Sequence, residues 1–145
     1  MAADGASDTV PDKFRDILTS ARTIAVVGAS QKAGRDSRAI TGYLIQHGYD
    51  VYPINPGHAG EKLFGRTIYA TLADVPVPID IVDIFRRSDA IPTVVDEALK
   101  LDPKPKVIWA QLGIAHEGAA ATAKAAGVTM VMDHCIKIEH RRLGL

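Results

Sequence analysis

Cysteine is almost absent from this sequence: Cys135 is the single one among 145 residues. One cysteine excludes an intramolecular disulfide, a CxxC redox motif and the paired cysteines of a zinc finger, and it suits a reducing compartment. The histidines His47, His58, His116 and His140 are scattered, without the spacing of metal ligands. We therefore expect no metal site and a cytoplasmic location.

An excess of charge is missing too, because Lys plus Arg and Asp plus Glu both number 17 and the formal net charge is zero. Such a balance provides no general attraction to nucleic acid, so a polyanionic ligand would need a local cluster of basic side chains. No apolar run approaches the roughly 20 residues of a membrane-spanning helix, and residues 1–11 lack the pattern of a signal peptide. We expect a soluble protein that binds neither nucleic acid nor membrane.

Residues 1–10, rich in Ala, Asp, Gly and Ser, are expected to form a disordered tail, and residues 11–145 a single domain with one core. Apolar or β-branched runs predict strands at 22–27, 50–55, 79–85, 106–112 and 128–132, with a shorter one at 67–70. Apolar residues at helical spacing predict helices after Pro11, from Asp36 or Ser37 to His47, from Ser88 or Asp89 to Leu99, and at 117–126. The mixed segment 136–143 is expected to pack back on the domain.

This alternation of strands and helices predicts an α/β fold. We expect a single Rossmann-like domain, in which a parallel sheet of about five strands carries helices on both faces. In such folds ligands bind at the carboxyl ends of the strands, where the strand order reverses. The residues that follow each predicted strand are therefore the candidates for function.

The loop after the first strand, residues 28–34, leads into a helix whose N-terminal amides can hold a phosphate. Gly28 and Gly34 permit a close approach of the backbone, and Ser30 and Ser37 can donate hydroxyl hydrogen bonds. Three basic residues, Lys32, Arg35 and Arg38, accompany them. The alternatives are that the glycines serve only a tight turn and that the basic residues are only a solvated helix start.

The loop departs from the fingerprint of dinucleotide-binding domains. Of the three glycines in that fingerprint only Gly28 fits, since Ser30 and Ala33 occupy the other two places. NAD-binding domains also carry an acid at the end of the second strand, where this sequence has Asn55. An asparagine there disfavours NAD and tolerates a ligand with a phosphorylated ribose.

Coenzyme A (CoA) has a pyrophosphate, a ribose 3′-phosphate and a long neutral pantetheine arm, so its site needs basic residues at one end and an apolar slot beyond them. Lys62 and Arg66, together with Lys32 and Arg35, could supply the basic residues. The segment Phe85–Arg87 closes the fourth predicted strand at the mouth of the same cleft. The alternative is that its two arginines serve only to keep the protein surface soluble.

His134 and Cys135 follow the last predicted strand and could suggest a base beside a nucleophile. Adjacent residues in an extended segment point to opposite sides, so the two cannot readily form a working pair. An inert, buried cysteine is the commoner state, and thiol exchange with a bound thiol is the alternative at this position.

Five motifs together resemble one known family, the stand-alone bacterial CoA-binding proteins related to the CoA-binding domain of the succinyl-CoA synthetase alpha subunit. The resemblance covers about residues 23–143 and rests on Ile24–Ser30 with Gly34, Tyr52–Pro56, Val82–Arg87, Trp109–Gly113 and Met132–Glu139. It does not extend to the synthetase domain that carries the phosphorylated histidine, so that catalysis is not expected here.

The resemblance implies how CoA would lie. Gly28, Ala29 and Ser30 would hold the phosphates, Asn55 and Pro56 would lie beside the adenosine, and Phe85 and Arg86 along the cleft. Gln111 and Gly113 would approach the pantetheine arm, with Asp133 and Cys135 near its end. With those chosen from the loops themselves, the candidate CoA-binding residues are Gly28, Ala29, Ser30, Lys32, Gly34, Arg35, Ser37, Asn55, Pro56, Lys62, Phe85, Arg86, Arg87, Gln111, Gly113, Asp133 and Cys135.

The main hypothesis is therefore non-catalytic binding of CoA or an acyl-CoA. An NAD(P)-dependent oxidoreductase and an acyl-CoA-handling enzyme that uses Cys135 are the catalytic alternatives. A structural partner that has kept the fold without the ligand is a third. The sequence leaves open a homo-oligomer or an unidentified protein partner, because it shows no heptad and no exposed apolar seam.

Overall fold

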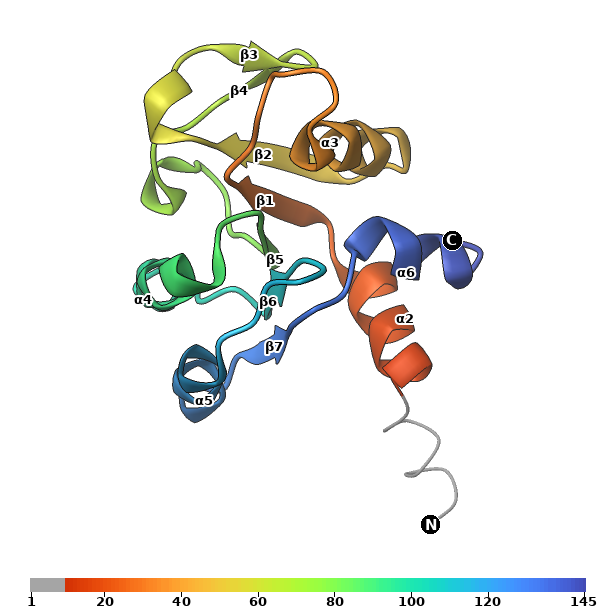
Figure 1. Cartoon of the computed structure of the whole chain (residues 1–145), viewed down its shortest axis with the longest axis vertical. Coiled ribbons are helices and arrows are strands. Elements are labelled where there is room, and N and C mark those ends of the chain that lie inside the picture. Colours follow the sequence, from red (N-terminus) through yellow and green to blue (C-terminus); the bar gives the residue numbers. More distant parts are fainter. Residues whose placement is uncertain (1–9) are drawn as a thin grey trace.

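The structure is a computed structural model that describes residues 10–145, so the tail expected at residues 1–10 falls almost wholly outside the described part. Its centre is a five-stranded, all-parallel sheet (Figure 1). The strands are β1 (Thr23–Val27), β2 (Asp50–Ile54), β5 (Ile81–Ile84), β6 (Val107–Ala110) and β7 (Thr129–Val131). Their spatial order is β2-β1-β5-β6-β7, which confirms the expected sheet. Because the chain runs from β1 outward to β2 and then crosses to β5, the order reverses between β1 and β5.

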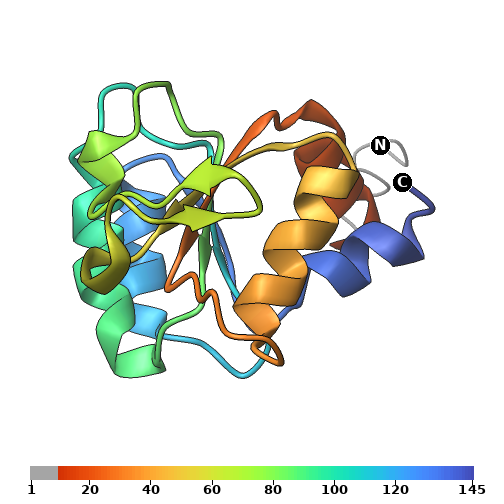
Figure 2. The same cartoon turned by 90° about the horizontal axis from the view of Figure 1, so that it is seen from above.

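Helices cover both faces of this sheet, as expected (Figure 2). One face carries α2 (Val10–Ser20), α3 (Asp36–Gln46) and α6 (Ile136–Arg142), and the other carries α4 (Ile91–Leu99) and α5 (Glu117–Ala125). Successive side chains of β1 point to opposite faces. Ile24 and Val26 accordingly pack in the cluster under α2, α3 and α6, whereas Ala25 and Val27 pack in the cluster under α4 and α5.

The strand expected at 67–70 is wrong in its extent. Residues Arg66–Thr67 form β4, which pairs antiparallel with β3 (Lys62–Leu63) in a small hairpin outside the main sheet. Farther along, only Tyr69 makes an isolated parallel bridge, to Ile54 at the end of β2. Arg66 and Thr67 therefore pair within the hairpin, and Tyr69 alone of this segment bridges to the end of β2.

The helices α3 and α4 both begin without a capping side chain. The residue before α3 is Arg35, whose side chain makes no capping hydrogen bond, while Ser37 is buried inside the first turn. Ser88 and Asp89 lie in a short 3₁₀ helix, Ser88–Ala90, ahead of α4. The Ser88 hydroxyl instead accepts a hydrogen bond from the amide of Ala115 at 3.1 Å, which joins the loops after β5 and β6.

The C-terminal segment packs back on the domain as expected, but its conformation is the helix α6. This helix lies against α2 and α3 (Figure 1). Ile136 and His140, one helical turn apart, are both buried in this contact. A helix of this length is marginal by itself, so packing on its neighbours supplies its stability.

Candidate functional site

The strand register aligns the carboxyl ends of the strands where the order reverses. Val27 is opposite both Ile54 and Ile84, and Ile84 is opposite Ala110. The loops that follow β1, β2, β5 and β6 therefore begin at the same level of the sheet. This common edge is where the sequence places its candidate residues.

Gly28 turns the chain sharply at the end of β1. Its φ angle is +86°, and a Cβ atom on this residue would lie 2.6 Å from the carbonyl oxygen of Phe85. The amides of Gly28 and Ala29 both donate to the carbonyl of Ile54, at 3.0 and 3.2 Å. Only glycine permits this backbone to pass so close to the end of β5.

Asn55 fastens the same loop to the end of β2. Its side-chain Nδ2 donates to the carbonyl of Ala29 at 2.8 Å, and its Oδ1 accepts from the amide of Gly57 at 3.0 Å. Both polar atoms of the amide are therefore engaged within the chain. Pro56 is the first residue of a 3₁₀ turn next to it, Pro56–His58.

A small hollow of about 290 Å³ opens between the Gly28 loop and the start of α3. Its lining includes Ser30, Arg35 and Ser37, and the Ser30 hydroxyl accepts from the amide of Lys32 at 3.1 Å. The N-terminus of α3 opens onto the hollow, so its amides and the positive end of the helix dipole favour an anion there. We call this hollow the anion hollow.

A larger hollow of about 590 Å³ adjoins it, because Asp36 and Phe85 line both. We call it the main hollow. It lies among α3, α6 and the loops after β5 and β6, and its lining combines apolar residues with four cations. The lining residues are Asp36, Ala39, Ile40, Phe85, Arg86, Arg87, Gln111, Leu112, Ile114, Cys135, Lys137, Ile138 and Arg141.

A buried polar link lies beneath the main hollow. The side-chain Nε2 of Gln111 donates to Oδ1 of Asp83, and its Oε1 accepts from the amide of Ile136 at 3.4 Å. Asp83 is fully buried on β5, and its Oδ2 has no partner among the described residues. Burial raises the pKa of Asp83 to about 8, and the hydrogen bond from Gln111 opposes that rise.

His134 and Cys135 do not form a hydrogen bond to each other in the described structure. His134 Nδ1 lies 3.2 Å from Oε2 of Glu139, while Cys135 is half-buried in the wall of the main hollow. Asp133 just before them has a φ angle of +60°, and its Oδ1 accepts from the amide of Gly113 at 2.7 Å. Asp133 therefore ties together the loops after β6 and β7.

The structure brings most sequence candidates together at this edge and sets others apart. The two hollows together contain Gly28, Ser30, Gly34, Arg35, Ser37, Phe85, Arg86, Arg87, Gln111 and Cys135. Ala29, Lys32, Asn55, Pro56, Lys62, Gly113 and Asp133 line neither hollow.

Two of the expected basic residues bind within the chain. Lys62 Nζ donates to the hydroxyl of Thr67 at 2.8 Å, on the opposite strand of the hairpin. Arg66 forms an ion pair with Asp50 and donates from Nε to the carbonyl of Val51 at 2.9 Å. Arg66 therefore serves mainly to hold the hairpin to β2.

Sequence reasoning missed Ile114 and the wall that α6 contributes, which consists of Lys137, Ile138 and Arg141. It also missed the buried link between Asp83 and Gln111. The i, i+4 spacing of Lys137 and Arg141 could have indicated one face of a helix, had the segment been recognised as helical.

Residues 10–145 contain neither a candidate membrane-spanning helix nor a candidate metal site. No helix there has the length and apolar character needed to cross a membrane. No group of three or more His, Cys, Asp or Glu side chains in the same part of the chain is placed to hold a metal ion.

Comparison with known proteins gives concordant results. The chain is 37% identical over 128 residues to the uncharacterized protein YneT of Bacillus subtilis, covering 88% of this chain and 92% of that one. It is 30% identical over 112 residues to an ADP-forming acetate–CoA ligase of Archaeoglobus fulgidus, covering 76% of this chain but only 16% of the ligase.

Solved structures agree with the fold. A hypothetical protein from Pyrococcus horikoshii superposes with a TM-score of 0.88 at 37% identity, over 96% of this chain and 95% of that one. A protein from Thermus thermophilus gives a TM-score of 0.88 at 38% identity, over 93% and 99%. The family model of the CoA binding domain matches residues 22–141. The chain therefore belongs to the family of CoA-binding domains, as its sequence motifs predict.

Proposed function

We propose that this chain binds CoA or an acyl-CoA, without catalysing a reaction on it, in the groove formed by the anion hollow and the main hollow. The observation that carries the proposal is the continuity of the two hollows through Asp36 and Phe85. A ligand with a charged head and a long, mostly neutral arm needs such a pair of adjoining environments.

The diphosphate of CoA suits the anion hollow. Ser30 and Ser37 offer hydroxyl groups, the start of α3 offers backbone amides, and Arg35 adds a positive charge at the rim. The pantetheine arm would then run past Phe85 into the main hollow, where Ile40 and Leu112 offer apolar surface and Gln111 a polar amide. The thiol end would lie toward Cys135, at the start of α6.

Binding without chemistry is favoured by the surroundings of Cys135. A nucleophilic thiol needs a base within hydrogen-bonding reach. The adjacent His134 ring is directed to Glu139, at 3.2 Å, and packs edge-on against Phe14. The imidazole is therefore held by other partners and does not activate the thiol.

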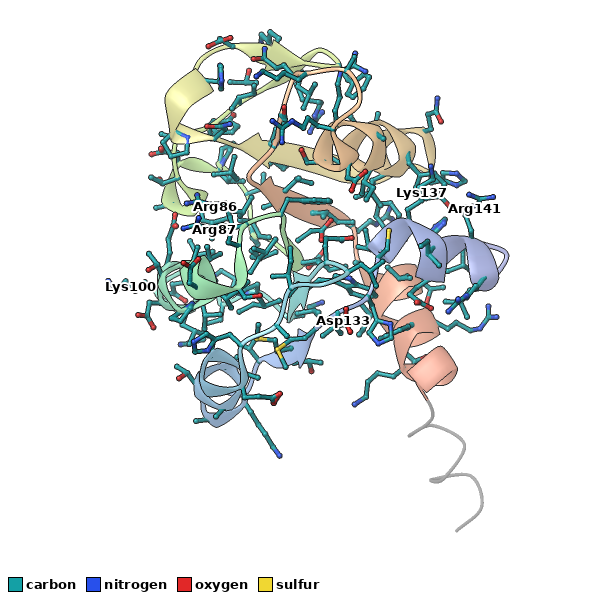
Figure 3. All side chains as sticks on the ribbon, viewed as in Figure 1. Arg86, Arg87, Lys100, Asp133, Lys137 and Arg141 are labelled. Atoms are coloured by element: carbon teal, nitrogen blue, oxygen red, sulfur yellow. The ribbon has the colours of Figure 1, made fainter. Side chains whose placement is uncertain are left out.

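Calorimetric titration of the protein with CoA, NAD and NADP tests this proposal. We expect saturable binding of CoA at one site and weaker or undetectable binding of the two dinucleotides. Arg35→Glu places a negative charge at the rim of the anion hollow, so it should weaken CoA binding by about tenfold or more. Lys100→Glu is the control, because Lys100 is exposed at the end of α4, away from both hollows (Figure 3).

Two results would overturn the proposal. One is the absence of any CoA binding by the wild-type protein at concentrations where its fold is intact. The other is binding of NAD or NADP in preference to CoA, which would favour an oxidoreductase instead.

A further inference from the structure

Two of the four cations that line the main hollow lie on α6. Lys137 and Arg141 are four residues apart on α6, so they lie on one face of the helix, and both line the hollow. The neighbouring Arg142 lies elsewhere and pairs with Glu139 at 3.4 Å. The helix therefore directs two of its basic side chains toward the hollow and commits a third to a partner.

These two cations are separate from the other basic residues of the groove. Figure 3 shows Arg86 and Arg87 above α4 at the end of β5, with Lys137 and Arg141 across the sheet edge on α6. Neither Lys137 nor Arg141 lines the anion hollow. A diphosphate bound at the start of α3 consequently leaves them without an anion of their own.

The immediate surroundings of the pair offer the ring face of Tyr43 but no acidic partner among the described residues. Among the described residues neither forms an ion pair. Lys137 Nζ lies 5.5 Å from the ring centre of Tyr43. The charge of Arg141 acts to lower the pKa of Tyr43, although desolvation outweighs it and raises that pKa. The single acid of the main hollow, Asp36, lies at its junction with the anion hollow.

Apolar surface lines the same hollow as the pair. Leu112 is 64% exposed and Ile138 is 40% exposed, and both line the hollow. Large exposed apolar side chains around a concave site are typical of surface kept for a ligand. The hollow thus offers an apolar surface beside the two cations of α6.

The spacing along α6 suits a short chain. Cys135 immediately precedes the helix, and at a rise of 1.5 Å per residue Lys137 and Arg141 lie about 3 and 9 Å farther along its axis. If the thiol end of CoA lies by Cys135, as the proposed function holds, a group attached to that thiol would run beside Ile138 toward the two cations.

We infer that the main hollow selects thioesters of CoA whose acyl group ends in a carboxylate, with Lys137 and Arg141 as the carboxylate's partners. This inference rests on the proposed function and deepens it by naming the class of ligand. Free CoA fills the groove only in part, and an acyl group with an apolar end leaves both cations desolvated and unpaired.

The test compares matched ligands by calorimetric titration. Glutaryl-CoA and valeryl-CoA have acyl chains of the same length and differ in the terminal carboxylate. CoA and dephospho-CoA are measured alongside them, because the 3′-phosphate of the ribose is the other anionic group that two cations could bind. We expect glutaryl-CoA to bind about tenfold more tightly than valeryl-CoA, the scale of a charge-assisted hydrogen bond.

The double variant Lys137→Gln/Arg141→Gln should abolish this preference and leave the affinity for CoA unchanged. Arg142→Gln is the control on the same helix, since Arg142 lies outside the hollow, and it should keep the preference. The unchanged affinity for CoA in the double variant also shows that the variant is folded.

Three results would overturn the inference. Equal affinities for glutaryl-CoA and valeryl-CoA in the wild type would remove the selectivity. A double variant that loses affinity for CoA but not for dephospho-CoA would assign the cations to the 3′-phosphate. A wild-type protein that binds none of the four compounds would overturn the proposed function itself, and the inference with it.

Discussion

Gln111 on the loop after β6 donates a hydrogen bond from its side-chain amide to the carboxyl group of Asp83, which is fully buried in the middle of the neighbouring strand β5. The other end of the same amide accepts from the backbone of Ile136 at the start of α6. One side chain thus joins two central strands to the helix that walls the main hollow. This arrangement costs free energy at the carboxyl group, because one of its oxygens has no hydrogen-bond partner within residues 10–145.

Asp83 should make the protein less stable as the pH rises. Its folded pKa of about 8 exceeds the ordinary value of 3.8, so between these values the native state binds a proton that the unfolded state has released. The free energy of unfolding therefore falls as the pH increases from about 4 to 8. Asp83→Asn is neutral at every pH, and we expect it to gain stability relative to the wild type over this window. Urea denaturation at pH 5 and pH 8 measures the difference in unfolding free energy between the two proteins. The same difference at both pH values would contradict a raised pKa for Asp83.

His140 should have the opposite dependence. It is buried between α6 and α3, and its Nδ1 lies 2.7 Å from the Tyr43 hydroxyl. Burial first, and then the charge of His47, lower the pKa of His140 below 6.5. Tyr49 packs edge-on against its ring, and Lys137 and Arg141 add positive charge from α6 itself.

Below pH 6.5 the unfolded His140 binds a proton that the native one does not, so this contribution to stability is lost as the pH falls. His140→Gln retains a hydrogen-bonding group but does not titrate. We expect the variant to be less stable than the wild type at pH 8 and the difference to narrow at pH 5. Chemical denaturation at both pH values measures this difference in unfolding free energy. A difference that widens on acidification would show that the histidine is charged in the native state.

Gly28→Ala tests the close passage between the β1 loop and β5. The added methyl group would meet the Phe85 carbonyl oxygen at 2.6 Å, in addition to the strain of a positive φ angle. Gly127→Ala is a matched control, because Gly127 has a φ angle of +80° with open space around it. We expect the control to cost about 1 kcal/mol of unfolding free energy and Gly28→Ala roughly 1–3 kcal/mol more. Equal losses would mean that the loop can move away from Phe85.

The sequence predicts the sheet well because its strands are buried on both faces and therefore appear as largely apolar runs, such as Val107–Ala110. It also predicts the edge that carries the site, since parallel strands bring their carboxyl ends together. Both predictions depend on local pattern and on general rules of topology.

The missed features depend on tertiary contacts. The partnership of Asp83 with Gln111 requires the register of β5 and β6, which no local pattern specifies. The helix α6 is too short to be stable alone and forms against α2 and α3, so its cations could not be placed beside the hollow from the sequence. The hydrogen bond by which Asn55 fastens the Gly28 loop likewise depends on a contact between distant segments, and the expected place of Asn55 beside an adenosine stays a prediction.

Hydrogen–deuterium exchange with and without CoA tests the location of the site most directly. We expect saturating CoA to protect the backbone amides of residues 28–38 and 135–141, which border the two hollows. The amides of residues 72–79 and 100–103, around a separate hollow, should be unchanged. Protection confined to this separate hollow, or no protection anywhere at saturating CoA, would contradict CoA binding in the anion hollow and the main hollow.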